Sequence, residues 1–228
     1  MRLVFGEKDA PYEEARVVLP VPYDLSLSFL PGARRGPEAI LLASRELEPF
    51  LLELGAAPEE VGIHAAEPVP WVAGMAEESH RLIREEALKH LRAGKWLVAL
   101  GGDHSVTHPL VQAHREALGE FSLLHVDAHA DLYRHASPFC RLLTEGFPLV
   151  QVGIRAMDRD SLRLARKRGV ALFPAHRIHR EGLPLDEILE ADLGLPRERV
   201  ASGQHGQELL GEEGLRVDVL GLDGKGQD

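Results

Sequence analysis

Short apolar runs alternate with longer amphipathic segments over most of this chain, and this alternation restricts the possible folds more than any other feature. Apolar runs predict buried strands at residues 16–21, 96–100, 121–126, 149–154 and 170–173. Amphipathic segments predict helices at residues 37–48, 73–92, 105–117, 158–168 and 185–191. Since strands that alternate with helices form a mainly parallel sheet covered by helices, the sequence predicts an α/β fold.

Two polar motifs each close one of these predicted strands. G-G-D-H-S at residues 101–105 contains His104, and H-V-D-A-H-A-D at residues 125–131 contains Asp127, His129 and Asp131. Alternate side chains of an extended segment share a face, so the last three can project toward one point. Buried carboxylates are costly without a compensating cation, and this mixed oxygen and nitrogen set suits Mn, Zn, Fe or Co. The two motifs together predict a metal site.

Neighbouring histidines have other expected roles. His125 shares a face with Asp127, and we expect it to hydrogen-bond a metal ligand rather than to bind metal. His135, in the following R-H-A-S-P segment, is either a general acid or base near neutral pH or a solvated loop residue. His108 is expected on a helix surface or in packing. The other histidines are expected at the surface: His64, His80, His90, His114, His176, His179 and His205.

Length, charge and cysteine content exclude several classes of protein. With 228 residues, 44% of them hydrophobic, the chain can bury one substantial core. Its 26 Lys and Arg against 36 Asp and Glu give a net charge of −10, which disfavours nucleic acid or an anionic membrane as a partner. No segment is long and apolar enough to predict a membrane span or a signal peptide. The single cysteine, Cys140, excludes an intrachain disulfide and favours a cytoplasmic protein.

These motifs resemble those of the ureohydrolases, the arginase and agmatinase family of binuclear manganese enzymes. V-P-Y-D and F-L-P-G-A-R-R-G-P-E-A-I, within residues 21–40, resemble the N-terminal segment of the agmatinase branch. V-Q-V-G-I-R at residues 150–155 resembles the strand after the catalytic loop. The resemblance covers residues 1–200 as one domain, and it implies an arginase-like three-layer α/β sandwich that forms a homo-oligomer.

The function that the resemblance implies is hydrolysis of a small cationic guanidino compound, most closely agmatine, to urea and an amine. Two Mn²⁺ ions per subunit would serve as the cofactor. His104 would bind one ion and His129 the other, and Asp127 would bridge them. Asp131 would bind the first ion and hydrogen-bond the attacking hydroxide, while His135 would shuttle protons.

The chain departs from the family pattern in two places. The loop before the H-A-S segment is short, which puts the reach of His135 in doubt. The third family motif, S-x-D-x-D-x-x-D-P, would complete both manganese sites, but R-E-R-V at residues 197–200 leads instead into A-S-G-Q-H-G-Q. We expect residues 201–228 to be an atypical Gly-rich tail, disordered or from a shifted reading frame. With four of six ligands, the second site and the activity would be impaired.

Within the family, hydrolysis of arginine, guanidinobutyrate or formiminoglutamate also stays open as an alternative to agmatine. Two alternatives to an active ureohydrolase remain open as well. A non-catalytic homologue would fold or oligomerise but bind at most one metal ion. A zinc-dependent deacetylase would share the architecture and the D-x-H signature, but those enzymes follow that histidine with histidine and glycine, where this chain has Ala130 and Asp131.

Overall fold

The structure is a computed structural model that describes residues 3–4, 7–25, 30–48, 50–57, 60–133 and 137–182. His135, the predicted helix at residues 185–191 and the tail at residues 201–228 lie outside the described residues. The described residues divide into two compact units, which we call the first unit (up to Gly119) and the second unit (from Glu120). Each unit is described by itself, and the single domain at residues 1–200 stays a prediction.

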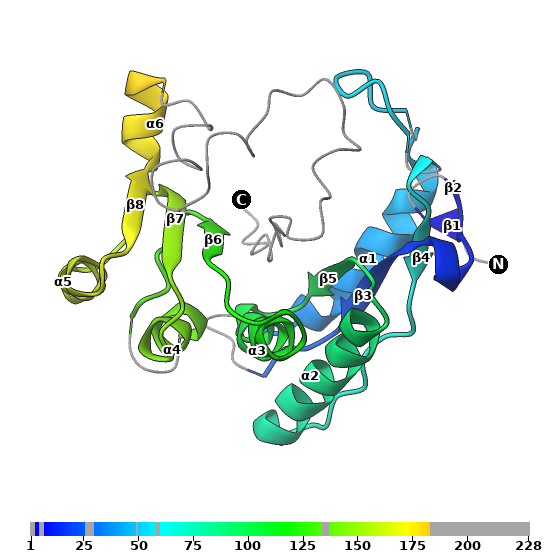
Figure 1. Ribbon diagram of the computed structural model, residues 1–228, viewed down its shortest axis with the longest axis horizontal. Coiled ribbons are helices and arrows are strands. Elements are labelled where there is room, and N and C mark those ends of the chain that lie inside the picture. The colour runs from blue at the N-terminus through cyan, green and yellow to red at the C-terminus, as the bar shows by residue number, and fades with distance from the viewer. Residues whose placement is uncertain are drawn as a thin grey trace. The chain divides into compact units, whose positions relative to one another are not determined.

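The first unit contains a three-stranded parallel sheet in which β3 (Arg16–Val21) is the central strand. Strand β4 (Ile63–Ala65) pairs with one edge of β3, and β5 (Leu97–Gly101) pairs with the other. Helices α2 (Ala76–Arg92) and α3 (Thr107–Leu118) pack against each other, and α1 (Gly36–Ala43) contacts β3 and β5 (Figure 1).

Alternate residues of β3 explain the core of this unit. Val17, Leu19 and Val21 are buried in one cluster with apolar side chains of α2 and α3, among them Ile83 and Leu110. Because side chains i and i+2 of a strand lie on the same face, one face of β3 supplies all three of these residues.

Short elements complete the first unit. Strands β1 (Leu3–Val4) and β2 (Glu7–Lys8) form an antiparallel pair. Among the described residues of this unit, 3₁₀ helices lie in the connections as η1 (Tyr12–Glu14), η2 (Ala33–Arg35), η3 (Ser44–Glu46) and η5 (His104–Val106).

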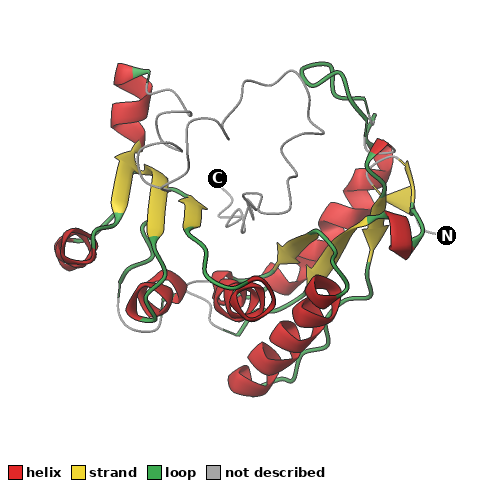
Figure 2. Ribbon diagram, viewed as in Figure 1, coloured by secondary structure: helices red, strands yellow, loops and turns green. Residues whose placement is uncertain are grey.

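The second unit contains a separate parallel sheet of three strands, β6 (Leu123–Val126), β7 (Leu149–Ile154) and β8 (Ala171–Pro174), with β7 in the middle. Its helices are α4 (Pro138–Thr144), α5 (Arg159–Arg168) and α6 (Ala175–Glu181) (Figure 2). Val150, Val152 and Phe173 form a small apolar cluster against which Ile178 of α6 packs. The opposite face of β6 and β7 includes the polar residues His125 and Gln151, which are partners in the strand register.

The α/β fold with parallel strands is confirmed. The predicted strands at residues 16–21 and 149–154 have the observed bounds. The predicted helix at residues 37–48 is shorter, since α1 ends at Ala43 and continues only as the 3₁₀ helix η3. Sequence patterning missed β4, α4 and α6, which have three, seven and seven residues, because so few residues show little periodicity.

The expectation of surface histidines is wrong for His90 and His114. His90 is buried and its Nδ1 lies 2.9 Å from the Tyr12 hydroxyl, and His114 is buried with Nδ1 at 2.8 Å from the Leu110 carbonyl oxygen. In both histidines, Nδ1 therefore has a hydrogen-bonding partner inside the fold.

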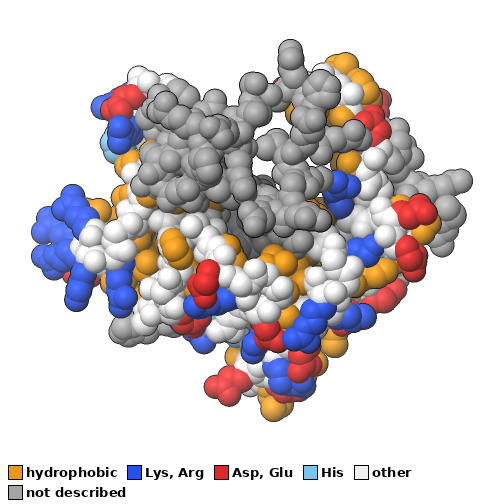
Figure 3. Space-filling model, in the orientation of Figure 1, with side chains coloured by type: hydrophobic (Ala, Val, Ile, Leu, Met, Phe, Trp, Pro, Cys, Tyr) orange, Lys and Arg blue, Asp and Glu red, His pale blue; other side chains and the backbone are white. Residues whose placement is uncertain are grey.

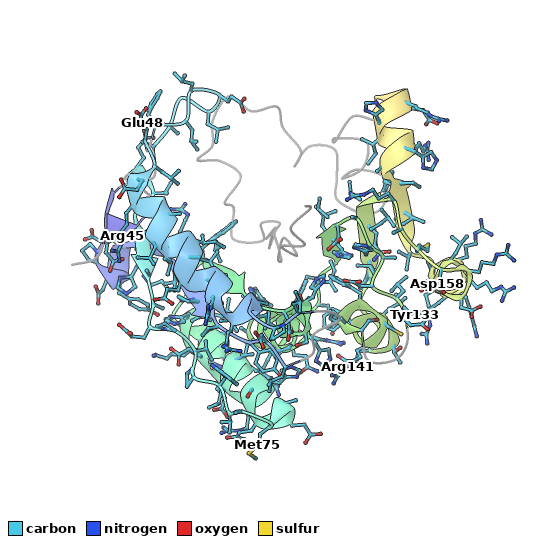
Figure 4. All side chains as sticks on the ribbon, turned by 180° about the vertical axis from the view of Figure 1, so that it is seen from behind. Arg45, Glu48, Met75, Tyr133, Arg141 and Asp158 are labelled. Carbon is cyan, nitrogen blue, oxygen red and sulfur yellow. The ribbon has the colours of Figure 1, made fainter. Side chains whose placement is uncertain are left out.

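Charge is unevenly distributed over the described surface. Lys and Arg side chains gather over α5 (Figure 3), whose last turn contains Arg166, Lys167 and Arg168. The helix begins after Asp158 (Figure 4). The Asp158 carboxylate accepts hydrogen bonds from the amides of Asp160 and Ser161. Among the described residues, no helix has the length and apolar character needed to cross a membrane.

Candidate metal centre

The loop that follows β6 is held by backbone hydrogen bonds to the end of β7. The Asp127 amide donates to the Val152 carbonyl (3.1 Å), and the Ala128 carbonyl accepts from the amides of Arg155 (2.8 Å) and Ala156 (2.9 Å). Asp127 Oδ1 also accepts from the His129 amide at 2.8 Å, which closes a tight turn around the carboxylate. These bonds fix the backbone from which the motif side chains project.

Two residues of this loop region have positive φ. Asp131 has φ +47° and is the one residue other than glycine with positive φ in the described part of the chain. Gly153, on β7, has φ +86°, and a Cβ there would lie 3.3 Å from the Asp127 carbonyl oxygen. The register of β7 against β8 shifts between Val152 and Ile154, so Gly153 lies in an irregularity of the sheet. Non-glycine residues with positive φ are uncommon and gather at functional sites.

Three side chains of the second unit converge beside this loop. His125, Asp127 and Asp131 each offer a ligand atom, and these atoms lie within 4.8 Å of one another. His125 is buried, and the side chain of Asp127 is 9% exposed. Two carboxylates at this separation repel each other unless a cation or hydrogen bonds compensate them. The donor set fits a divalent metal ion of the Mn, Fe, Co or Zn type.

His129 lies next to Asp127 but outside this group of three. Its side chain is 43% exposed, and its Nδ1 lies 3.6 Å from Asp127 Oδ1. The backbone of His129 forms a bridge with Ala156 at the end of β7. The metal-binding role of His129 therefore stays a prediction, as does the role of His135.

His104 belongs to the first unit, where the turn that carries it is tightly packed. The amide of Asp103 donates to the Tyr23 carbonyl at 2.8 Å. A Cβ at Gly102 would lie 1.9 Å from the same carbonyl oxygen, so only glycine fits there. Asp103 Oδ1 accepts from the Ser105 amide at 2.9 Å and so caps η5, the short helix in which His104 is the first residue. The packing and hydrogen bonds of the turn thus explain why the G-G-D-H-S motif has glycine at position 102 and aspartate at position 103.

The V-P-Y-D segment supports that turn. Tyr23 is buried, and burial, followed by the nearby Asp103 carboxylate, raises the pKa of its hydroxyl. The buried carboxylate of Asp24 accepts from the Gly32 amide at 2.7 Å and from Arg34 at 3.3 Å. The N-terminal motif residues therefore link β3 to the P-G-A-R-R segment and to the His104 turn.

Sequence reasoning missed Gln151, which is fully buried on β7 directly opposite His125 in the strand register. Its Nε2 lies 2.6 Å from the Ala130 carbonyl and 3.0 Å from His125 Nδ1. The signal was available, because Gln151 is the one polar residue in the apolar run L-V-Q-V. A polar residue at a buried strand position needs a hydrogen-bonding partner.

Comparisons with known proteins give a consistent result. A model of the arginase family matches residues 14–195. The N(1)-aminopropylagmatine ureohydrolase of Thermus thermophilus is 94% identical over 200 residues, which cover 84% of this chain and 68% of that protein. The agmatinase of Bacillus anthracis is 30% identical over 204 residues, covering 85% of this chain and 69% of that protein.

Solved structures agree with the sequence matches. The proclavaminate amidino hydrolase of Streptomyces clavuligerus superposes with a TM-score of 0.72 at 25% identity, covering 84% of this chain and 70% of that one. The motifs, the parallel strands and these matches lead to one conclusion: the chain belongs to the arginase family, as an agmatinase-like ureohydrolase that acts on carbon–nitrogen bonds.

Proposed function

We propose that the protein hydrolyses the guanidino group of an N1-aminopropylated agmatine, releasing urea and an amine. The proposal rests mainly on the 94% identity over 200 residues with a protein named N(1)-aminopropylagmatine ureohydrolase. Agmatine, which the motifs alone suggested, is the second substrate in order of preference, because the relatives named agmatinase are more distant, at about 30% identity. Both compounds are small and cationic, which agrees with the net charge of −10.

The proposed metal ligands are His104, Asp127, His129 and Asp131, with Mn²⁺ as the proposed ion. The two carboxylates supply negative charge, and the imidazoles supply neutral nitrogen donors, a combination that suits Mn²⁺. When bound, the metal would lower the pKa of water and so supply a hydroxide nucleophile at neutral pH. The grouping of Asp127 and Asp131 within 4.8 Å supports their part of this set.

Proton handling is assigned to two residues. Asp131 is proposed to hold and orient the nucleophile through a hydrogen bond, and its membership of the group of possible metal ligands supports this role. His135 is proposed as the group that delivers a proton to the leaving amine, on the basis of the family resemblance alone.

The missing third motif favours a second candidate. Without S-x-D-x-D-x-x-D-P, the proposed second metal site lacks two carboxylates, and we propose that the activity of this chain is weak. The second candidate is accordingly a non-catalytic homologue that binds at most one ion. If residues 201–228 come from a shifted reading frame, resequencing of the gene would find the shift, and an intact frame ending at Asp228 would refute it.

The test combines metal analysis with a substrate screen. Purified protein loaded with Mn²⁺ is analysed for metal per chain, and urea release is measured with N1-aminopropylagmatine, agmatine and arginine. Urea release that is fastest with N1-aminopropylagmatine supports the proposal. One ion or fewer per chain with no urea from any compound supports the non-catalytic alternative.

Substitutions connect the activity to the site. Asp127→Ala and Asp131→Ala should each remove Mn²⁺ binding and urea release, because each takes a carboxylate from the site. Asp160→Ala is the matched control, since Asp160 is exposed on α5 and pairs with Arg163. Equal manganese content in all three variants would argue against these ligands.

A homo-oligomer is proposed from the family resemblance, and a cytoplasmic location from the single cysteine. Burial raises the pKa of the Cys140 thiol, which makes it a poor nucleophile and fits a structural role. Light scattering coupled to size-exclusion chromatography would test the oligomer, and a monomeric mass would contradict it.

A further inference from the structure

Gln151 connects two parts of the proposed metal centre within the second unit. Its side-chain amide nitrogen Nε2 lies 2.6 Å from the Ala130 carbonyl oxygen and 3.0 Å from His125 Nδ1. Gln151 is 0% exposed, and His125 is 2% exposed. The two residues lie directly opposite each other on the paired strands β6 and β7, so the register of the sheet sets the positions from which their side chains project.

The Ala130 carbonyl decides how the amide of Gln151 is oriented. A carbonyl oxygen only accepts hydrogen bonds, so the atom that faces it at 2.6 Å must be the NH₂ nitrogen rather than the amide oxygen. The second hydrogen of that NH₂ group is then available to His125 Nδ1, 3.0 Å away. Nδ1 must therefore accept, and in the neutral imidazole the hydrogen is on Nε2.

That hydrogen is on the ring nitrogen that lies beside a proposed metal ligand. His125 Nε2 lies 3.5 Å from Asp127 Oδ2, close enough for an electrostatic contact but without hydrogen-bond geometry. The ring of His125 stacks on Phe139 of α4 with centroids 3.7 Å apart and an angle of 17° between the planes, which holds the ring orientation. The Nε2–H group and the carboxylate therefore attract each other electrostatically, which favours one orientation of the carboxylate.

We propose that Gln151 is a positioning residue of the metal centre: by donating to Nδ1 it fixes His125 as the Nε2–H tautomer, which orients the Asp127 carboxylate. His125 then presents an N–H group to a ligand and is not itself a ligand, because its Nε2 lone pair is protonated. The same amide also holds the Ala130 carbonyl, between His129 and Asp131. This inference rests on the proposed metal site but concerns residues outside its ligand set.

The first test reads the tautomer in the metal-free protein, so it does not depend on metal binding or activity. Long-range ¹H–¹⁵N spectra of protein labelled with ¹⁵N-histidine distinguish a protonated from a bare ring nitrogen. The His125 signals are assigned by their loss in His125→Gln. We expect Nε2 protonated and Nδ1 bare, and a hydrogen on Nδ1 in the unsubstituted protein would overturn the proposal.

Two substitutions of Gln151 test the cause. In Gln151→Glu the carboxylate can only accept, so Nδ1 of His125 should gain a hydrogen. Gln151→Leu, which has a similar volume, removes both hydrogen bonds and should weaken Mn²⁺ binding by about tenfold or more, as for other partners of metal ligands. Unchanged Mn²⁺ affinity in Gln151→Leu would overturn the proposal.

The matched control is Gln112→Leu. Gln112 lies on α3 with its Nε2 3.3 Å from His108 Nε2, so this variant also removes a glutamine–histidine contact, in a different part of the chain. Its Mn²⁺ affinity should equal that of the unsubstituted protein. If the unsubstituted protein binds no Mn²⁺, the proposed function fails, whereas the tautomer measurement still decides the role of Gln151.

Discussion

At several positions in this protein, the residue type is determined by a backbone carbonyl that lies close to the Cα atom, as much as by the need for a reactive side chain. Gly153 lets the backbone of β7 approach the carbonyl of Asp127, and Gly102 does the same for the carbonyl of Tyr23. Asp131 has a positive φ although it carries a side chain. Backbone strain of this kind costs free energy and is retained where the side chain is needed. These three positions lie in or beside the two sequence motifs, so the motifs combine ligands with the backbone geometry that presents them.

Gly153→Ala should destabilise the protein and weaken Mn²⁺ binding. An alanine at φ +86° is strained by about 1–3 kcal/mol, and its Cβ would press on the Asp127 carbonyl oxygen at 3.3 Å. The control is Gly146→Ala, at φ +92° with no atoms within 4 Å of the new Cβ. Unfolding by urea should show a lower free energy of unfolding in both variants. Calorimetric titration should show weaker Mn²⁺ binding only for Gly153→Ala. Equal affinities in the two variants would contradict this.

At the scale of elements, the strand ends determine where polar residues gather. Strand β5 ends at Gly101 just before the His104 turn, and β6 ends at Val126 just before Asp127. Ligands of parallel α/β sheets gather at such carboxyl ends. Within the first unit, the Tyr23 carbonyl, two residues after the end of β3, accepts a hydrogen bond from the Asp103 amide, so the His104 turn is tied to the segment that follows β3.

Gly102→Ala should therefore disrupt the His104 turn. The new Cβ would lie 1.9 Å from the Tyr23 carbonyl oxygen, so the backbone must move and the free energy of unfolding should fall by about 1–3 kcal/mol or more. Gly36→Ala is the control, because its Cβ would meet only the Gly101 oxygen at 3.7 Å. Chemical denaturation of both variants measures the difference, and equal stabilities would refute the assigned packing.

His90 on α2 should make the stability depend on pH. Burial lowers its pKa, with opposing influence from Glu86 and smaller contributions from Lys89 and His64, so the folded protein binds a proton on this ring less tightly than the unfolded chain does. The unfolded chain takes up the proton at higher pH. Stability should therefore fall as the pH drops from neutral through the ordinary histidine pKa of about 6.5, and level off below the lowered pKa.

The variant His90→Gln tests this dependence, since glutamine does not titrate and its amide can still bond the Tyr12 hydroxyl. Free energies of unfolding at pH 8 and pH 5 should differ less for the variant than for the unsubstituted protein. The same pH dependence in both would exclude His90 as the source.

For the whole molecule, charge and ligand binding are the relevant properties. The net charge is −10, yet Lys and Arg gather on α5, so the acidic character is concentrated elsewhere. The family match at residues 14–195 includes segments of both units, so both carry family residues. A metal ion that binds only the folded protein stabilises it by mass action.

Mn²⁺ should therefore raise the thermal unfolding midpoint. At free Mn²⁺ of 100 times Kd, the expected stabilisation is about 2.7 kcal/mol, and a chelator should reverse it. Scanning calorimetry with and without Mn²⁺ measures the shift, with Asp127→Ala as the variant that should not respond. An unshifted midpoint at saturating Mn²⁺ would argue against a metal site formed by folding.

The sequence by itself determined the α/β class, most of the strands and the expectation that Asp127 and Asp131 lie close together. The spacing of apolar residues and the position of a polar motif at a strand end can both be read from a short stretch of chain. Only the tertiary structure decided that His90 is buried, that Gly102 and Gly153 are required by close approach, and that Gln151 faces His125 across two strands. These features depend on residues far apart in the sequence, and strand register and packing bring them together.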